Sequence, residues 1–359
     1  MAVPTLDGVR AEQVETKRLA SRILSSGPKS GVSVLFLHGN LTSATWWEET
    51  MRALPSGFRG VAPDQRGYGD ADPQKKIDAT RGTGDLMDDA LALLDALGIE
   101  RAHVVGNSMG GSVVWQLLMT SPERFLSATV VSPGSPYGFG GTKDLDGTPC
   151  YPDFSGSGGG LANRELMERI AAADRSLESP FSPRAALRTL VYKPPFVPAR
   201  EEELLSATLK THLGPEDLPG DAVSSSNWPY VAPGQWGLAN ATSPKYAGAI
   251  ERVYGIEPKV PILWVRGSHD VAVSDAAASC PGALGAKGLI PGWPGPEVFP
   301  PQPMVGQTRA VLQRYAAAGG RYREVVIEET GHVPFIEKPE AFNQLFHEHL
   351  ARTTGSRAV

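Results

Sequence analysis

The sequence has few cysteines and no long apolar run. Only two cysteines, Cys150 and Cys280, occur in 359 residues, and neither has the spacing of a metal site. They could pair in space, but the interpretation we adopt is two free thiols in a cytoplasmic protein. No apolar run approaches the length that spans a bilayer. Residues 1–13 have neither a basic start nor an apolar core, so we expect no secretory signal.

The chain also lacks an excess of positive charge. Its formal net charge is -5 and its pI is about 5.9, whereas a nucleic acid or an anionic membrane would favour a basic face. We therefore expect neither as a partner. Hydrophobic residues make up 41% and charged residues 20% of the chain, as in an ordinary globular protein with a sizeable core. Composition does not indicate the oligomeric state.

Strand-like and helix-like segments alternate over the first third of the chain. Residues 14–24 predict one or two strands of a hairpin, and short apolar runs over 32–37 and 126–131 are typical of buried parallel strands. Residues 85–97 form an amphipathic pattern that ends at Gly98, which predicts a helix. This alternation implies a mostly parallel sheet with helices on both faces.

The alternation stops at Pro133 and resumes only after residue 255. Over 134–255 we predict loops and three helices, at 163–173, 182–191 and 199–213. Strand character returns at 260–265 and 324–327, and a closing helix covers 339–350. We therefore predict a core domain made of residues 1–133 and 256–359, interrupted by a largely helical insertion over 134–255.

A five-residue motif, Gly106-Asn107-Ser108-Met109-Gly110, lies between a predicted strand and a predicted helix. The pattern Gly-x-Ser-x-Gly in this context indicates a nucleophile elbow, a tight turn that exposes the serine hydroxyl. Small residues must flank the serine on both sides. We therefore predict that Ser108 is a catalytic nucleophile.

A serine nucleophile needs a base that is oriented by an acid, and both candidates follow predicted strands. Asp270 comes after the strand at 260–265, and His332 comes after the strand at 324–327. Residues that follow parallel strands gather at one edge of a sheet, so we expect Ser108, Asp270 and His332 to meet there. Asp275 is the alternative acid.

The oxyanion of such a reaction needs two backbone N–H donors. We expect one from Met109, at the start of the helix after the nucleophile, where the helix dipole also helps. The second is expected from Asn40, in the loop His38-Gly39-Asn40-Leu41, with Leu41 as the alternative. His38 itself is interpreted as a structural turn residue. We expect no metal and no organic cofactor.

These motifs resemble the α/β-hydrolase superfamily. The likeness covers Leu37-His38-Gly39-Asn40, Arg66-Gly67-Tyr68-Gly69, the elbow and Gly331-His332, and it is greatest to the branch of epoxide hydrolases and haloalkane dehalogenases. That branch has an aspartate nucleophile where this chain has Ser108, and dehalogenases have a tryptophan where this chain has Met109. The serine elbow is also similar to that of carbon–carbon bond hydrolases, although Val333-Pro334-Phe335 lacks the tryptophan of that family.

The resemblance implies that the insertion over 134–255 is a cap above the active site. Its aromatic residues are candidates for a bulky apolar pocket. We predict five substrate-binding residues. Leu41 and Trp46 follow the predicted strand at 32–37, and Tyr137, Trp228 and Tyr230 are aromatic residues of the insertion. A Pro/Gly-rich excursion over 281–307 either shapes substrate access or is a passive surface loop.

The predicted function is a serine hydrolase that cleaves carboxylic esters or lactones, with a small molecule as its substrate. Two alternatives remain. The first is carbon–carbon hydrolysis with the same three residues, and the second is a ligand receptor on a hydrolase fold with vestigial turnover. The sequence does not indicate the size of the acyl or alcohol group.

Overall fold

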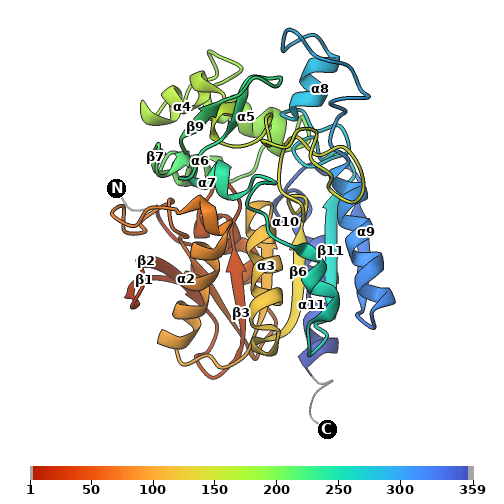
Figure 1. Cartoon of the computed structure of the whole chain (residues 1–359). Helices are drawn as coiled ribbons and strands as arrows, with labels where there is room; N and C mark the ends of the chain where they lie inside the picture. The colour runs from red at the N-terminus through yellow and green to blue at the C-terminus, as the bar shows by residue number, and fades with distance from the viewer. Residues whose placement is uncertain (1–2, 355–359) are drawn as a thin grey trace.

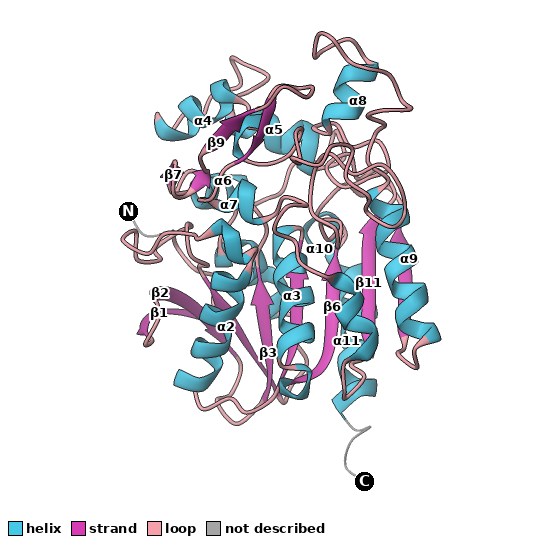
Figure 2. Ribbon diagram, in the orientation of Figure 1, coloured by secondary structure: helices cyan, strands magenta, loops and turns pink. Residues whose placement is uncertain are grey.

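A twisted, mostly parallel sheet with helices on both faces forms the body of the molecule (Figures 1 and 2). The structure is a computed structural model and describes residues 3–354. The sheet has eight strands in the order β1-β2-β4-β3-β5-β6-β11-β12. β1 pairs antiparallel with β2, β2 pairs antiparallel with β4, and the remaining neighbours are parallel. The predicted fold class is therefore confirmed.

Each predicted core strand is present. Their bounds are β1 (Val9–Glu15), β2 (Ala20–Ser26), β3 (Val32–Leu37), β4 (Phe58–Pro63), β5 (Ala102–Asn107), β6 (Phe125–Val131), β11 (Ile262–Gly267) and β12 (Tyr322–Ile327). β1 and β2 form a hairpin, with Val9 opposite Ser26 and Glu15 opposite Ala20. The predicted range of 14–24 covers most of β2 but only the last two residues of β1. The central strands β3, β5 and β6 are almost wholly buried, which explains their continuous apolar runs.

Helices cover the two faces of the sheet and bury separate apolar clusters. One face packs against α2 (Gly84–Ala96), α3 (Met109–Thr120) and α9 (Met304–Ala317). The other packs against α1 (Glu48–Arg52), α10 (Pro334–Glu337) and α11 (Pro339–Thr354). Ser43 caps the 3₁₀ turn η1 (Ala44–Trp47) before α1, and Gly98 follows α2 with φ +65°, as its predicted stop requires.

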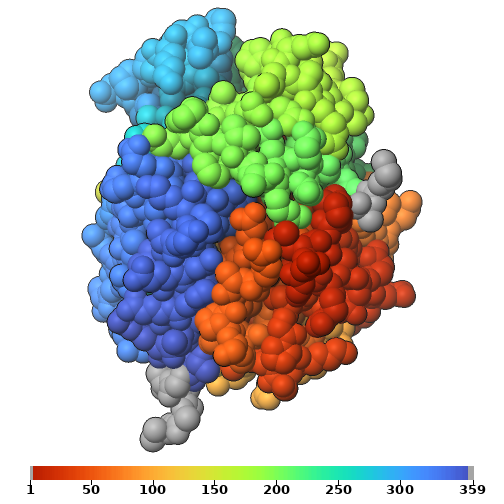
Figure 3. Space-filling view, turned by 180° about the vertical axis from the view of Figure 1, so that it is seen from behind, coloured from red at the N-terminus to blue at the C-terminus, as the bar shows by residue number. Residues whose placement is uncertain are grey.

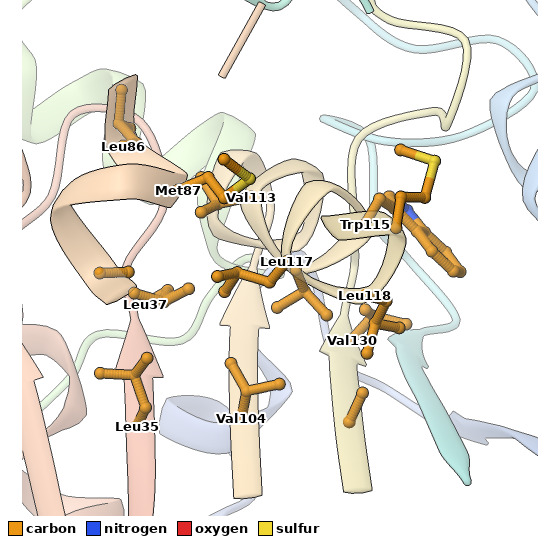
Figure 4. Packing of buried hydrophobic residues seen from close by; sticks show 14 of the residues in the cluster. Leu35, Leu37, Leu86, Met87, Val104, Val113, Trp115, Leu117, Leu118 and Val130 are labelled. Carbon is orange, nitrogen blue, oxygen red and sulfur yellow. The ribbon is translucent and has the colours of Figure 1, made fainter. Parts of the chain in front are cut away.

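An apolar cluster under α3 holds this helix against the sheet. Figure 4 shows Val113, Leu117 and Leu118 of α3 packed over Val104 of β5 and Val130 of β6. All five side chains are at most 1% exposed. Burying a Val or Leu side chain contributes about 1.5–3 kcal/mol, so this contact fixes the helix that follows Ser108.

Most of the insertion between β6 and β11 lies across one end of the molecule (Figures 1 and 3), above the C-terminal ends of the parallel strands (Figure 2). The three predicted helices correspond to α4 (Arg164–Ala171), a pair of consecutive turns, and α6 (Glu201–Thr208). The pair is α5 (Pro183–Ala186) followed by a π-helical turn, η5 (Leu187–Val191). Asn163 caps α4 and Ser182 caps α5 through their side chains.

The insertion also contains short strands that we did not predict. They are β7 (Leu213–Gly214), β8 (Leu218–Pro219), β9 (Ala222–Ser224) and β10 (Val231–Pro233), and two helical turns follow, α7 (Leu238–Ala241) and η6 (Ile250–Gly255). Strands of two or three residues are too short to produce a periodic pattern. Ile250 and Val253 of η6 pack in the cluster with α3 and α9, so the domain boundary at residue 255 stays a prediction.

The excursion over 281–307 has more regular structure than its composition indicates. It begins with the short helix α8 (Pro281–Ala286), and its last residues already belong to α9. We did not predict α9 from the sequence, because its start lies within a proline-rich stretch. Cys280, just before α8, and Cys150 are free cysteines in the structure. Within residues 3–354, none of the helices combines the length and apolar character needed to cross a bilayer.

Candidate active site

Ser108 occupies a strained turn between β5 and α3. Its backbone has φ 55° and ψ −118°, a region that residues other than glycine rarely adopt. Backbone hydrogen bonds hold the turn: Ser108 N–H donates to Val131 C=O at 3.0 Å, and Gly111 N–H donates to Ser108 C=O at 2.9 Å. The strained elbow that the motif predicts is therefore present.

The two motif glycines are required by close backbone contacts. A Cβ atom on Gly106 would lie 2.3 Å from the carbonyl oxygen of Gly110, and one on Gly110 would lie 2.3 Å from that of Leu37. Real Cβ atoms do not approach a backbone oxygen so closely. Glycine at both positions lets α3 start directly against β3 and β5, which leaves the Ser108 side chain partly exposed at the turn.

Asp270 and His332 meet at the same edge of the sheet. Asp270 follows β11 and His332 follows β12, and Asp270 Oδ2 lies 2.9 Å from His332 Nδ1. Both residues are buried. Asp270 Oδ1 accepts hydrogen bonds from the N–H groups of Ala272 and Val273, each at 2.9 Å. These bonds fix the carboxylate so that its second oxygen faces the imidazole.

The alternative acid, Asp275, has another role. Its Oδ1 accepts hydrogen bonds from Val305 N–H at 2.8 Å and Gly306 N–H at 3.0 Å, in the first turn of α9. A carboxylate at this position satisfies free N–H groups and interacts favourably with the helix dipole. The structure therefore brings Asp270, and not Asp275, to His332.

Asn107 connects the histidine loop to the elbow, a role that we did not predict from the sequence. Its side-chain amide is buried and donates to Val131 C=O at 3.1 Å and to His332 C=O at 3.3 Å. Because Asn107 directly precedes Ser108, these bonds hold the backbone of His332 against the Ser108 turn. A polar residue at a buried strand end was the only signal available in the sequence.

The loop after β3 runs directly against the elbow. A Cβ atom on Gly39 would lie 3.1 Å from Ser108 Cβ and 3.0 Å from Asn107 Oδ1, so a larger residue here would require these side chains to shift. The following residue, Asn40, is exposed, and Leu41 has φ 56°. Gly39, which directly precedes Asn40, therefore lies against the Ser108 turn, and the role of Asn40 or Leu41 as the second oxyanion donor stays a prediction.

Tyr68 joins the two predicted oxyanion residues. Its hydroxyl donates to Asn40 Oδ1 at 2.6 Å and lies 3.9 Å from Met109 Sδ. Tyr68 is 1% exposed, and burial raises the pKa of its phenol. A neutral hydroxyl therefore supports both sides of the candidate oxyanion site. In the sequence, Tyr68 stood out only as part of a family motif, and nothing indicated a role for its hydroxyl.

His38 is a structural residue, as predicted. Its Nε2 accepts a hydrogen bond from Gln65 N–H at 2.9 Å, so Nδ1 carries the proton and donates to Gly39 C=O at 2.9 Å. Burial lowers the pKa of His38 to about 4. The ring is therefore neutral near pH 7 and holds the loop that carries Gly39 and Asn40.

His103 is a buried packing residue. His103 lies in β5 and is buried, with Nδ1 2.8 Å from Ser127 Oγ and Nε2 3.1 Å from Thr354 Oγ1. Burial lowers the pKa of His103 to about 3. Within residues 3–354, no group of three or more His, Cys, Asp or Glu side chains is arranged to hold a metal ion.

The predicted substrate-binding residues are spread over several packing sites. Trp46 is buried, donates its indole N–H to Leu204 C=O at 3.3 Å, and stacks on Tyr192 with ring centroids 6.1 Å apart. Tyr137 is 8% exposed. Leu41 belongs to the loop whose Gly39 touches the Ser108 turn. A substrate contact of Leu41, Trp46 or Tyr137 stays a prediction.

Trp228 and Tyr230 connect the insertion to the excursion over 281–307. Trp228 is buried against Phe299, with ring centroids 4.8 Å apart, and donates its indole N–H to Pro291 C=O at 2.9 Å. Tyr230 is 60% exposed. Trp228 therefore packs two parts of the molecule together, and a substrate contact for either residue stays a prediction.

Two buried glutamines also anchor the excursion to residues 135–140. Gln307 Oε1 accepts from Ser135 Oγ at 2.6 Å and from Gln302 Nε2 at 3.0 Å. Gln302 also bonds both Gly138 C=O and Gly140 N–H, at 2.9 and 2.8 Å. Both glutamines are fully buried. The C-terminal end of the excursion is therefore joined to the chain that follows β6. Both alternatives for the excursion, a role in substrate access and a passive surface loop, stay predictions.

Comparison with known proteins gives one family model and several relatives. A model described as the alpha/beta hydrolase fold matches residues 32–151. The chain is 32% identical over 148 residues to the AB hydrolase superfamily protein YfhM of Bacillus subtilis, covering 41% of this chain and 50% of that protein. It is 35% identical over 124 residues to the carboxylesterase YbfK of the same organism, covering 34% and 41%. The chain thus spans half or less of the length of these relatives.

Solved structures resemble the chain over nearly its whole length. The carboxylesterase CesB (YbfK) from Bacillus subtilis has a TM-score of 0.56 at 19% identity and covers 96% of this chain and 92% of that one. A 2-hydroxy-6-oxo-6-phenylhexa-2,4-dienoate hydrolase from Rhodococcus sp. strain RHA1 has a TM-score of 0.60 at 20% identity and covers 96% and 99%. At these identities the likeness concerns the fold.

Proposed function

The chain belongs to the α/β-hydrolase superfamily, and on that premise we propose that it is a serine hydrolase of carboxylic esters or lactones. The observation that carries the proposal is the 2.9 Å contact between Asp270 and His332 beside a strained elbow with serine at its tip. The carboxylesterase YbfK, named for the same kind of reaction, is among the relatives.

In the first half-reaction, Ser108 Oγ attacks the ester carbonyl carbon while His332 Nε2 takes the hydroxyl proton. Asp270 accepts the Nδ1–H bond at 2.9 Å, which selects the tautomer with a free Nε2 and stabilises the imidazolium that forms. The tetrahedral intermediate then collapses, and His332 returns the proton to the leaving alcohol. Ser108 remains as an acyl ester.

The oxyanion of that intermediate is stabilised by backbone N–H groups. Met109 N–H lies at the first position of α3, where the helix dipole favours negative charge. Asn40 N–H supplies the second donor from the loop that touches Ser108. Removing one such donor costs about 10²–10³ in rate in known enzymes.

In the second half-reaction, water replaces the alcohol. His332 Nε2 takes a proton from water, which attacks the acyl carbon of the Ser108 ester, and the same N–H groups hold the second oxyanion. The collapse of this intermediate releases the carboxylic acid and returns the proton from His332 to Ser108. This chemistry proceeds with side-chain and backbone groups of this chain alone.

Labelling with a fluorophosphonate, followed by peptide mapping, tests the proposal together with a panel of p-nitrophenyl esters. We expect the label on Ser108, turnover of at least one ester, and loss of both in Ser108→Ala. Unchanged turnover in Ser108→Ala contradicts the mechanism. One slow stoichiometric event without cycling favours the receptor alternative, and hydrolysis of vinylogous diketones without ester turnover favours the carbon–carbon alternative.

A further inference from the structure

A single carboxylate bridges the histidine loop and the cap. Glu337 is the last residue of α10, and its Oε1 accepts a hydrogen bond from Gly331 N–H at 2.8 Å. Its Oε2 accepts from Lys193 N–H, also at 2.8 Å. Gly331 directly precedes His332, whereas Lys193 lies in the cap, 144 residues away from Glu337 along the chain.

A second bond joins the same two segments at the histidine itself. His332 N–H donates to Val191 C=O at 2.8 Å, and Val191 ends the π-helical turn η5. A Cβ atom on Gly331 would lie 2.7 Å from the Val191 oxygen and 2.8 Å from Lys193 N. The two segments are therefore in direct backbone contact, and glycine at position 331 is required for it.

Partial burial makes the charged form of the Glu337 carboxylate unfavourable unless hydrogen bonds compensate for the lost solvation. Burial raises the pKa of Glu337, and the nearby Asp270 carboxylate raises it further, while backbone hydrogen bonds from Lys193 and Gly331 oppose this. A partly buried carboxylate is normally retained where its oxygens satisfy donors that would otherwise be unpaired. Here those donors are the N–H groups on either side of the His332–Val191 bond.

We propose that Glu337 is a positioning residue for His332, which it holds by clamping Gly331 N–H and Lys193 N–H together. This role rests on the proposed function, because it requires His332 to act as the base. With Asn107 holding the His332 carbonyl group from the elbow side, Glu337 and Val191 hold the backbone on the cap side. The imidazole then keeps Nδ1 on Asp270 and presents Nε2 to Ser108, and the position of the cap segment is set together with that of the base.

The test compares Glu337→Ala and Glu337→Gln with the matched pair Glu340→Ala and Glu340→Gln. Glu340 is an exposed glutamate in the first turn of α11, three positions along the chain. In Glu337→Ala we expect kcat per labelled active site to fall about 10–100-fold, because small displacements of catalytic groups have effects of this order. KM should stay within about threefold, since the clamp acts on the base and not on ground-state binding.

Glu337→Gln separates positioning from a folding defect. Its amide keeps one oxygen acceptor and turns an N–H donor toward the other backbone N–H, so kcat should lie between that of the wild type and Glu337→Ala. The downfield proton resonance of the His332–Asp270 hydrogen bond should shift or broaden in both Glu337 variants and stay unchanged in both Glu340 variants. If Glu337→Ala does not fold, Glu337→Gln carries the test alone.

The outcomes distinguish this role from the proposed function. Wild-type kcat and an unchanged downfield resonance in the folded Glu337 variants overturn the positioning role, even when Ser108 is labelled and esters are hydrolysed. A lower melting temperature with full kcat per labelled site also overturns it, because Glu337 would then serve stability only. If wild-type Ser108 takes no label and no ester is hydrolysed, the proposed function itself fails and the role of Glu337 falls with it.

Discussion

Replacing Asp270 with asparagine should stop catalysis while leaving the fold intact. Asp270 Oδ1 accepts two backbone N–H bonds, from Ala272 and Val273, and only an oxygen can take that place. The amide of the introduced asparagine must therefore direct its NH₂ group toward His332 Nδ1. That nitrogen then becomes an acceptor, and the proton of the neutral imidazole moves to Nε2, where it prevents that nitrogen from accepting the Ser108 proton.

The expected loss follows from this change of tautomer. Loss of the correct tautomer lowers kcat by about 10⁴-fold in a known serine protease, which corresponds to about 5.4 kcal/mol of transition-state stabilisation. Because both Oδ1 hydrogen bonds are kept, the midpoint of urea unfolding should change little. Steady-state hydrolysis of the best p-nitrophenyl ester measures kcat, and circular dichroism confirms the fold.

Asp275→Asn is the matched control. It lies five positions along the chain and keeps an oxygen for Val305 N–H and Gly306 N–H, so kcat should equal that of the wild type. Loss of one charge at the start of α9 should lower the free energy of unfolding by about 0.3–1 kcal/mol. A disabled Asp275→Asn enzyme beside an active Asp270→Asn enzyme refutes the assignment of the acid.

Three further predictions concern the elbow, the oxyanion site and pH. Gly110→Ala places a Cβ atom 2.3 Å from the Leu37 carbonyl oxygen. It should lower the free energy of unfolding, measured by urea titration, by about 3 kcal/mol or more. A change below about 1 kcal/mol contradicts the close contact. Tyr68→Phe removes the 2.6 Å hydrogen bond to Asn40. It should lower kcat about tenfold, as expected for one lost hydrogen bond of about 1.4 kcal/mol. An unchanged kcat argues against a role of the Tyr68 hydroxyl in supporting the oxyanion site. Burial lowers the pKa of three histidines, to about 4 for His38, about 3 for His103 and about 4 for His349. The unfolded chain binds these protons near pH 6.5, whereas the folded protein does not. The free energy of unfolding should therefore fall as the pH is lowered from 6.5 to 4, by about 1.4 kcal/mol per pH unit for each histidine. A melting temperature that stays constant over this range contradicts the prediction.

The parts of the site that could be predicted from the sequence are those with a local signal. Ser108 has a glycine two positions before it and two positions after it. Each of these glycines is required by a close backbone contact in the structure. Asp270 and His332 each follow an apolar run that becomes a strand. Because the C-terminal ends of parallel strands lie at one edge of the sheet, the positions of these two residues directly after strands were enough to predict that they lie close together.

The missed features depend on contacts between distant segments. Nothing near Tyr68 or Asn40 in the sequence indicates that the two side chains bond across 28 residues. Glu337 and Lys193 are separated by 144 residues, and their contact exists only once the insertion over 134–255 lies against the loop that carries His332. The helix α9 was missed for two reasons. Prolines precede it, and Asp275, which accepts hydrogen bonds from its first turn, lies 30 residues before Val305.

The central claim is that Ser108 forms a covalent acyl intermediate. The most direct measurement is rapid acid quenching during turnover of a p-nitrophenyl ester, followed by intact-mass and peptide mass analysis. The account predicts a mass increase equal to the acyl group on the peptide that contains Ser108, formed within the initial burst of p-nitrophenol. Hydrolysis without an acyl adduct on this peptide, or an adduct on another residue that disappears with turnover, would contradict it.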